Sequence, residues 1–141
     1  FISGKDIPGA IVISADVEAG VDPTFISVYE KNNSAYLGKG ITLTKYGGVR
    51  GKSGASEASA EFVAEIRDIL DKNNIRYQSS QLSKVDQGGG GTIAYHAAKY
   101  GMNVIDAGVA VLSMHAPWEI TSKEDICQIY ECYKAFLKID N

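Results

Sequence analysis

The sequence Ala-Ile-Val-Ile-Ser-Ala-Asp-Val, residues 10–17, is the stretch that decides the fold. Its apolar residues form a short β-branched run directly after Pro8-Gly9, which is typical of a strand buried on both faces. The segment therefore predicts a buried strand with Asp16 at its polar end.

Outward from this strand, apolar runs alternate with helical periodicities along the whole chain. Turn residues bound the segments 41–46, 75–82 and 104–112, for which we expect strands. Apolar residues at three-and-four spacing predict a helix over 56–72, and an alanine-rich segment ended by glycine predicts another over 92–100.

The last helix is expected to begin at a capping box, in which Thr121 is followed three residues later by Glu124. Its apolar face, which should dock on a sheet, consists of Ile126, Ile129, Tyr130, Tyr133 and Leu137. Strands that alternate with helices predict an α/β fold, a layered sheet with flanking helices, in one domain.

Composition narrows the classes of partner and of location. The 141 residues are 45% apolar and 22% charged, which excludes pervasive disorder, and a formal charge of −3 argues against nucleic acid or membrane partners. No apolar run approaches bilayer-spanning length, and no signal peptide stands at the start. Cys127 and Cys132 lie five positions apart in the predicted helix, a spacing that suits neither a disulfide nor a metal pair. Reduced thiols indicate a cytoplasmic protein.

Two polar side chains follow predicted strands, where open α/β sheets bind ligands. Asp16 closes the first strand, and His115 follows the strand predicted over 104–112. A carboxylate oxygen and an imidazole nitrogen are ligand types that zinc accepts. The alternatives are an aspartate that caps a turn and a histidine that is hydrogen-bonded within a loop.

The glycine-rich segment 86–92 stands before a predicted helix and is either a tight turn or a wall of a substrate pocket. It lacks the Lys-Ser/Thr of a P-loop and the spacing of a dinucleotide fingerprint, which argues against nucleotide binding.

Basic and nucleophilic side chains offer weaker candidates for chemistry. Lys45, Arg50 and Lys52 form either a solvated basic loop or a site for a substrate carboxylate. His96 is expected to be structural or exposed. A serine hydrolase built on Ser113 is disfavoured because no Gly-x-Ser-x-Gly elbow surrounds the serine.

Several motifs, taken in order, resemble the C-terminal part of an aspartyl aminopeptidase. The resemblance covers nearly the whole chain and rests on Ser14-Ala15-Asp16-Val17, Leu37-Gly38-Lys39-Gly40, Gly54-Ala55-Ser56, residues 60–64, residues 84–94 and residues 111–117. It implies a two-zinc exopeptidase with an α/β catalytic domain of the zinc exopeptidase (phosphorylase/hydrolase-like) type. It also implies a peptide substrate with an acidic N-terminal residue and assembly into dodecamers.

The resemblance assigns roles to individual residues. Asp16 matches a terminal ligand of one zinc, and His115 matches a ligand of the other. Lys45 is expected to face the acidic substrate side chain, and Gly90, Gly91 and Thr92 to line the same cleft.

Other parts of the family pattern do not occur in this sequence, which begins with Phe1 rather than Met. The family also uses an earlier histidine, a bridging aspartate and a Glu-Glu pair that contains the general base, and no Glu-Glu occurs here. The resemblance implies that these groups, the general-base glutamate included, lie upstream of Phe1, and it assigns no catalytic acid or base within the chain.

The resemblance therefore implies that residues 1–141 are the C-terminal part of a catalytic domain, without the N-terminal part and the dimerisation insert, and inactive alone. The alternative is a non-catalytic α/β binding or assembly module derived from the same scaffold.

Overall fold

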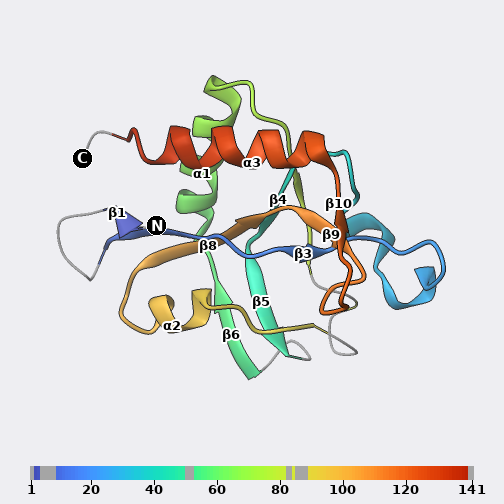
Figure 1. Ribbon diagram of the computed structural model, residues 1–141. Coiled ribbons are helices and arrows are strands. Elements are labelled where there is room, and N and C mark those ends of the chain that lie inside the picture. The colour runs from blue at the N-terminus through green and yellow to red at the C-terminus, as the bar shows by residue number, and fades with distance from the viewer. Residues whose placement is uncertain (1, 4–8, 50–52, 82–83, 85–88, 140–141) are drawn as a thin grey trace.

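The computed structural model describes residues 2–3, 9–49, 53–81, 84 and 89–139. Its centre is a mixed five-stranded sheet in the order β1-β2-β8-β4-β7 (Figure 1). The strands are Ile2–Ser3 (β1), Ile11–Ser14 (β2), Asn103–Gly108 (β8), Ile41–Thr44 (β4) and Tyr77–Ser79 (β7). Strands β2 and β8 are parallel, whereas β4 runs antiparallel to β8 and parallel to β7.

Two smaller sheets extend from this centre. Strand β3 (Glu18–Ala19) follows β2, and β9 (Ala110–Leu112) follows β8; the two are again parallel, and β10 (Ile120–Thr121) pairs with β9. The hairpin of β5 (Tyr46–Val49) and β6 (Ser53–Glu57) leaves the main sheet after β4 (Figure 1). Because β2 and β8 end at one edge, the segments that follow them run side by side.

Helices cover both faces of the main sheet (Figure 1). Helices α1 (Ala60–Lys72) and α3 (Lys123–Phe136) contact each other over one face, and the short α2 (Ala94–Ala98) lies against the other. Two 3-10 turns, Ile26–Val28 (η1) and Lys31–Asn33 (η2), lie in the connection between β3 and β4.

The alternation of side chains along the strands explains this layering. Ile13 and Ile105 belong to the large core cluster under α1 and α3. Their neighbours Val12 and Val104 point the other way and form a second cluster with Ala94 of α2. The prediction of an α/β fold with a layered sheet and flanking helices is therefore confirmed.

Helix α1 matches its predicted apolar face. The Ser59 hydroxyl accepts a hydrogen bond from the Phe62 N–H at its start, and Asn73 ends it. Phe62, Ile66 and Leu70 are buried on one face, as the spacing predicts. The predicted start was wrong, because residues 53–57 form β6.

Helix α3 corrects two predictions. Its N-cap is Ser122, whose hydroxyl accepts from the Asp125 N–H, whereas Thr121 belongs to β10. Its buried residues are Asp125, Ile129, Cys132 and Phe136. Of the predicted face, Ile129 is buried and Tyr133 is half-buried, but Ile126, Tyr130 and Leu137 are exposed.

Two predicted strands are each divided. The segment 41–46 contains the start of β5 as well as β4, and the segment 104–112 belongs to β8 and β9, which lie in different sheets. The remaining predicted strands and the alanine-rich helix are present but shorter.

The described part of the chain contains no helix both long and apolar enough to span a bilayer. Cys127 is exposed and Cys132 is buried, and neither forms a disulfide. The prediction of unpaired thiols is confirmed.

Candidate active site

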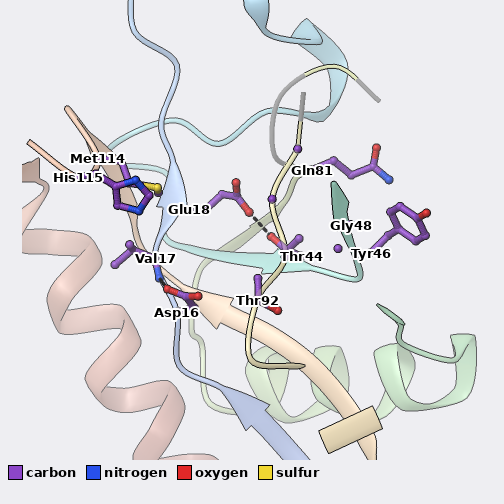
Figure 2. A pocket seen from close by; sticks show the side chains of 14 residues that line it. Asp16, Val17, Glu18, Thr44, Tyr46, Gly48, Gln81, Thr92, Met114 and His115 are labelled. Atoms are coloured by element: carbon purple, nitrogen blue, oxygen red, sulfur yellow. Dashed lines mark hydrogen bonds between the residues drawn. The ribbon is translucent and has the colours of Figure 1, made fainter. Parts of the chain in front are cut away.

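A pocket opens where β2, β4 and β9 end (Figure 2). Its cavity measures about 160 Å³. It is lined by residues 16–18, 44 and 46–48, by residues 89–92, and by Gln81, Met114 and His115. Asp16 and His115 therefore lie at one pocket, as expected from their positions after neighbouring strands.

Asp16 is exposed at the rim, and its Oδ1 accepts a hydrogen bond from the following Val17 N–H at 2.9 Å. The backbone of Asp16 crosses β8 closely: a Cβ on Gly108 would lie 1.6 Å from the Asp16 carbonyl oxygen. A glycine is required at position 108 because any side chain there would displace the segment that carries the carboxylate.

His115 lies on a tight turn after β9. Ser113 and His115 have φ values of 57° and 67°, an uncommon conformation for residues other than glycine. The turn is closed by the Ala116 N–H, which donates to the Ser113 carbonyl, and the His115 N–H donates to Glu119 Oε1 at 2.7 Å. These bonds hold an otherwise strained backbone, and Figure 2 shows the His115 ring beside Met114 at the pocket wall.

A buried carboxylate, Glu18, lies two residues beyond Asp16 in the same lining. It is 6% exposed, and its Oε2 accepts a hydrogen bond from the Thr44 hydroxyl at 2.5 Å (Figure 2). Burial raises the pKa of Glu18 above its usual value, and the hydrogen bond from Thr44 partly opposes that rise. The inner surface of the pocket thus holds a carboxyl group shielded from bulk water.

A second buried carboxylate, Asp106 of β8, supports the glycine segment. It is 6% exposed, and its Oδ2 accepts from the Thr92 hydroxyl at 2.8 Å. Burial also raises the pKa of Asp106, an effect that the nearby hydroxyls of Ser14 and Thr92 partly oppose. Asp106 is close enough to Glu18 for the charge of one carboxylate to disfavour ionisation of the other.

The donor types at the rim fit zinc. Asp16 offers carboxylate oxygen, and no described residue hydrogen-bonds the imidazole of His115, so its ring nitrogens are available as ligands. Within the described ranges, no cluster of three or more His, Cys, Asp or Glu side chains is placed to hold a metal ion.

The structure brings most of the predicted site residues together, but not all. Gly90, Gly91 and Thr92 line the pocket as expected. Lys45 does not: its exposed Nζ lies 3.0 Å from Glu57 Oε1, in an ion pair outside the lining.

Some predictions fall on parts of the chain that the structure does not describe. Arg50 and Lys52 lie outside the described residues. Phe1, upstream of which the general-base glutamate is expected, also lies outside them, so the position of that glutamate stays a prediction.

The weaker candidates remain apart from the pocket lining. His96 is exposed on α2, next to the ring of Tyr95. Ser113 is exposed on the turn before His115 and does not line the pocket.

Sequence reasoning missed Glu18, Thr44 and Asp106. Glu18 had one signal, its position two residues after Asp16, and Asp106 had another, a carboxylate inside an otherwise apolar strand. Buried acids without a local partner are rare enough to mark a site.

A carboxylate and an imidazole, both donor types that zinc accepts, meet at one edge of an α/β sheet, and comparison with known proteins shows the family of the chain. Residues 4–137 match the family described as Aminopeptidase I zinc metalloprotease (M18). The chain belongs to this family of zinc metallopeptidases. The resemblance found in the sequence is thereby confirmed at the level of the family.

Known relatives agree over most of the chain. A probable M18 family aminopeptidase 1 from Clostridium acetobutylicum is 59% identical over 133 residues, which cover 94% of this chain and 29% of the relative. The crystal structure of aminopeptidase I from that organism superposes with a TM-score of 0.86 at 57% identity, covering 93% of this chain and 28% of that one. A structure of the Saccharomyces cerevisiae mApe1 dodecamer has a TM-score of 0.72 at 28% identity, over 92% of this chain and 27% of that one. The chain thus spans less than a third of the length of these relatives.

Proposed function

We propose that this chain forms part of the catalytic domain of a zinc-dependent aminopeptidase that releases N-terminal residues from peptides. The observation that carries the proposal is that two zinc-type donors from distant segments, Asp16 and His115, line one pocket. Membership of the M18 family supports it. A cytoplasmic location agrees with the two unpaired cysteines.

In this proposal, Asp16 and His115 each hold one of two zinc ions. When bound there, zinc would polarise the scissile carbonyl and lower the pKa of a water molecule toward about 7. Residues 89–92 form the wall along which the peptide backbone lies, and the Glu119 carboxylate keeps the turn of His115 in place.

The remaining ligands and the general base are assigned to a part of the protein upstream of Phe1. This chain would be the C-terminal part of the catalytic domain, lacking the N-terminal part and the dimerisation insert. Its coverage of 29% of the Clostridium relative agrees with a chain that corresponds to one part of a longer protein. The 141-residue chain alone should then be inactive, because two donors do not complete a two-metal site.

Two finer properties complete the proposal. The complete protein would prefer acidic N-terminal residues, the preference that the resemblance to an aspartyl aminopeptidase implies. It would also assemble into a homo-oligomer, for which the yeast dodecamer provides the precedent.

The decisive experiment replaces the two donors in the complete protein. His115→Ala and Asp16→Asn should each remove bound zinc, measured by elemental analysis, and lower the release of N-terminal residues at least about 100-fold. His96→Ala is the matched control, because that histidine lies on α2 outside the pocket lining. Retention of both zinc and activity in the two donor variants would refute the proposal.

A panel of substrates tests the preference for acidic N-terminal residues and the requirement for zinc. Chromogenic amides of Asp, Glu, Leu and Lys, assayed with and without a zinc chelator, report the preference and the metal requirement together. Equal kcat/KM values for Asp and Leu substrates would refute the preference for acidic residues but not the proposed aminopeptidase activity. A complete protein that acts equally well with the chelator would remove the zinc mechanism.

A further inference from the structure

We propose that Asp106 is a positioning residue that fixes the glycine wall of the pocket, residues 89–92, through the hydroxyl of Thr92. The proposal rests on the function proposed above and adds a residue to it. Asp106 does not line the pocket, so its role would be exerted through Thr92.

The hydrogen bonds give the Thr92 hydroxyl a defined direction. It donates to Asp106 Oδ2 at 2.8 Å and accepts from the Ala94 N–H at 3.2 Å. The acceptor is 6% exposed, and a hydrogen bond to such a carboxylate is stronger than one to a neutral group. The hydroxyl therefore joins the central strand β8 to the start of α2 and holds the last residue of the wall.

The rest of the wall has few supports among the described residues. The Gly90 carbonyl accepts from the Gly48 N–H of β5 at 3.1 Å. Gly89 has a φ of 97°, and a Cβ added to Gly91 would meet no atom within 4 Å. A glycine segment of this kind has many accessible backbone conformations, so its position depends on the bonds at Gly90 and Thr92.

Among the described residues, only the Thr92 hydroxyl donates a hydrogen bond of good geometry to the Asp106 carboxylate. Its other oxygen, Oδ1, is buried and has no hydrogen-bond partner in the described part of the chain. The Ser14 hydroxyl, across the β2–β8 pair, is close enough to favour the charged carboxylate, but it does not reach hydrogen-bond geometry. A buried acceptor without a partner costs free energy, so this carboxylate contributes little to stability on its own. Its position is explained if its role is to orient Thr92 rather than to stabilise the fold.

The test uses the complete, zinc-loaded protein and two disruptive variants. Thr92→Val and Asp106→Ala should each raise KM about tenfold, with kcat and zinc content changed less than about twofold, because the wall loses its position while the metal ligands stay. Hydrogen exchange at the amides of residues 89–94 should become faster in both variants. The KM of the double variant should be no higher than that of Thr92→Val alone, because both changes remove the same hydrogen bond between Thr92 and Asp106.

Two further variants separate positioning from charge and from general loss of a buried hydroxyl. Asp106→Asn keeps an oxygen that can accept from Thr92, so its KM should stay within about twofold of that of the unaltered protein. Thr42→Val is the matched control, because the Thr42 hydroxyl is buried in β4 and makes no hydrogen bond in the described part of the chain. Its KM should not change.

Several results would overturn the proposal. Thr92→Val with an unaltered KM and unaltered exchange at residues 89–94 would do so, and it remains informative if Asp106→Ala fails to fold. Loss of zinc in Thr92→Val, or a defect in Asp106→Asn as large as in Asp106→Ala, would assign Asp106 another role. If the unaltered protein shows no aminopeptidase activity, the proposed function fails, while the exchange experiment still decides whether Asp106 positions the wall.

Discussion

Asp125 and Asp106 are both buried carboxylates, but the chain pairs them differently. Asp125, fully buried in the first turn of α3, accepts the Gly38 N–H at 2.7 Å and the Gly40 N–H at 2.8 Å, so both of its oxygens are bonded. Asp106, beneath the pocket, has one oxygen bonded and the other without a partner in the described part of the chain. Asp125 thus joins α3 to the segment of Gly38 and Gly40, whereas the role that we propose for Asp106 is to orient Thr92.

The comparison predicts the largest change in stability at Asp125. Asp125→Ala would leave two amide N–H groups without their acceptors, at about 1–3 kcal/mol each, so the free energy of unfolding should fall by about 2–6 kcal/mol. Denaturant titration measures this loss. Asp68→Ala, which removes an exposed aspartate paired with Lys72, is the control and should change stability by less than about 0.5 kcal/mol. Equal losses of stability in the two variants would show that the hydrogen bonds of Asp125 do not hold α3 to the segment of Gly38 and Gly40.

The next largest effect is expected at the pocket, from Gly108→Ala. The new Cβ would lie 1.6 Å from the Asp16 carbonyl oxygen and 2.6 Å from its carbonyl carbon, and these backbone atoms cannot move aside as a flexible side chain can. The Asp16 segment must shift, so zinc affinity of the complete protein should fall about 10- to 100-fold, measured by competition with a chelator. Gly91→Ala controls for the general effect of replacing a glycine by alanine on stability, since its Cβ would meet no atom within 4 Å. Unchanged zinc affinity in Gly108→Ala would indicate that Asp16 does not bind the metal.

Some elements of the fold could be predicted from the sequence, and others could not. Strand β2 and helix α1 follow from local patterns, a β-branched run and a regular apolar spacing. The buried face of α3 does not, because it includes Asp125, whose partners Gly38 and Gly40 lie far away in the chain. Periodicity predicted the buried Ile129 but also selected the exposed Ile126 and Tyr130. It missed Asp125, since nothing local distinguishes an aspartate that meets two distant amides from a solvated one.

Prediction of the site had a similar limit. Asp16 and His115 follow strands, so a rule about strand ends brings them to one pocket. Glu18 and Asp106 were missed because their hydroxyl partners, Thr44 and Thr92, come from other elements. Lys45 was placed in the pocket by resemblance, but its ammonium lies outside the lining in an ion pair, and its neighbour Thr44 is the residue that reaches Glu18.

The smallest effect concerns the core beneath α3, where a neutral group is buried without a function in the pocket. Burial raises the pKa of the Cys132 thiol from 9.0 to about 12, because the thiolate would lose its hydration. This contribution to stability is fully present below about pH 9, the pKa in the unfolded chain, and is lost as the pH rises toward the folded value of about 12.

Between about pH 8 and about pH 10, the free energy of unfolding should therefore fall by about 1 kcal/mol more in the unaltered protein than in Cys132→Ala. Denaturant titration at several pH values measures the two slopes. Cys132→Ala lowers stability at every pH because it leaves a cavity, so the difference in slope is the informative quantity. Cys127→Ala, at an exposed position of the same helix, should keep the slope of the unaltered protein. If Cys132→Ala and the unaltered protein show parallel curves, the thiol ionises as readily in the folded chain as in the unfolded one, and this part of the core is open to water.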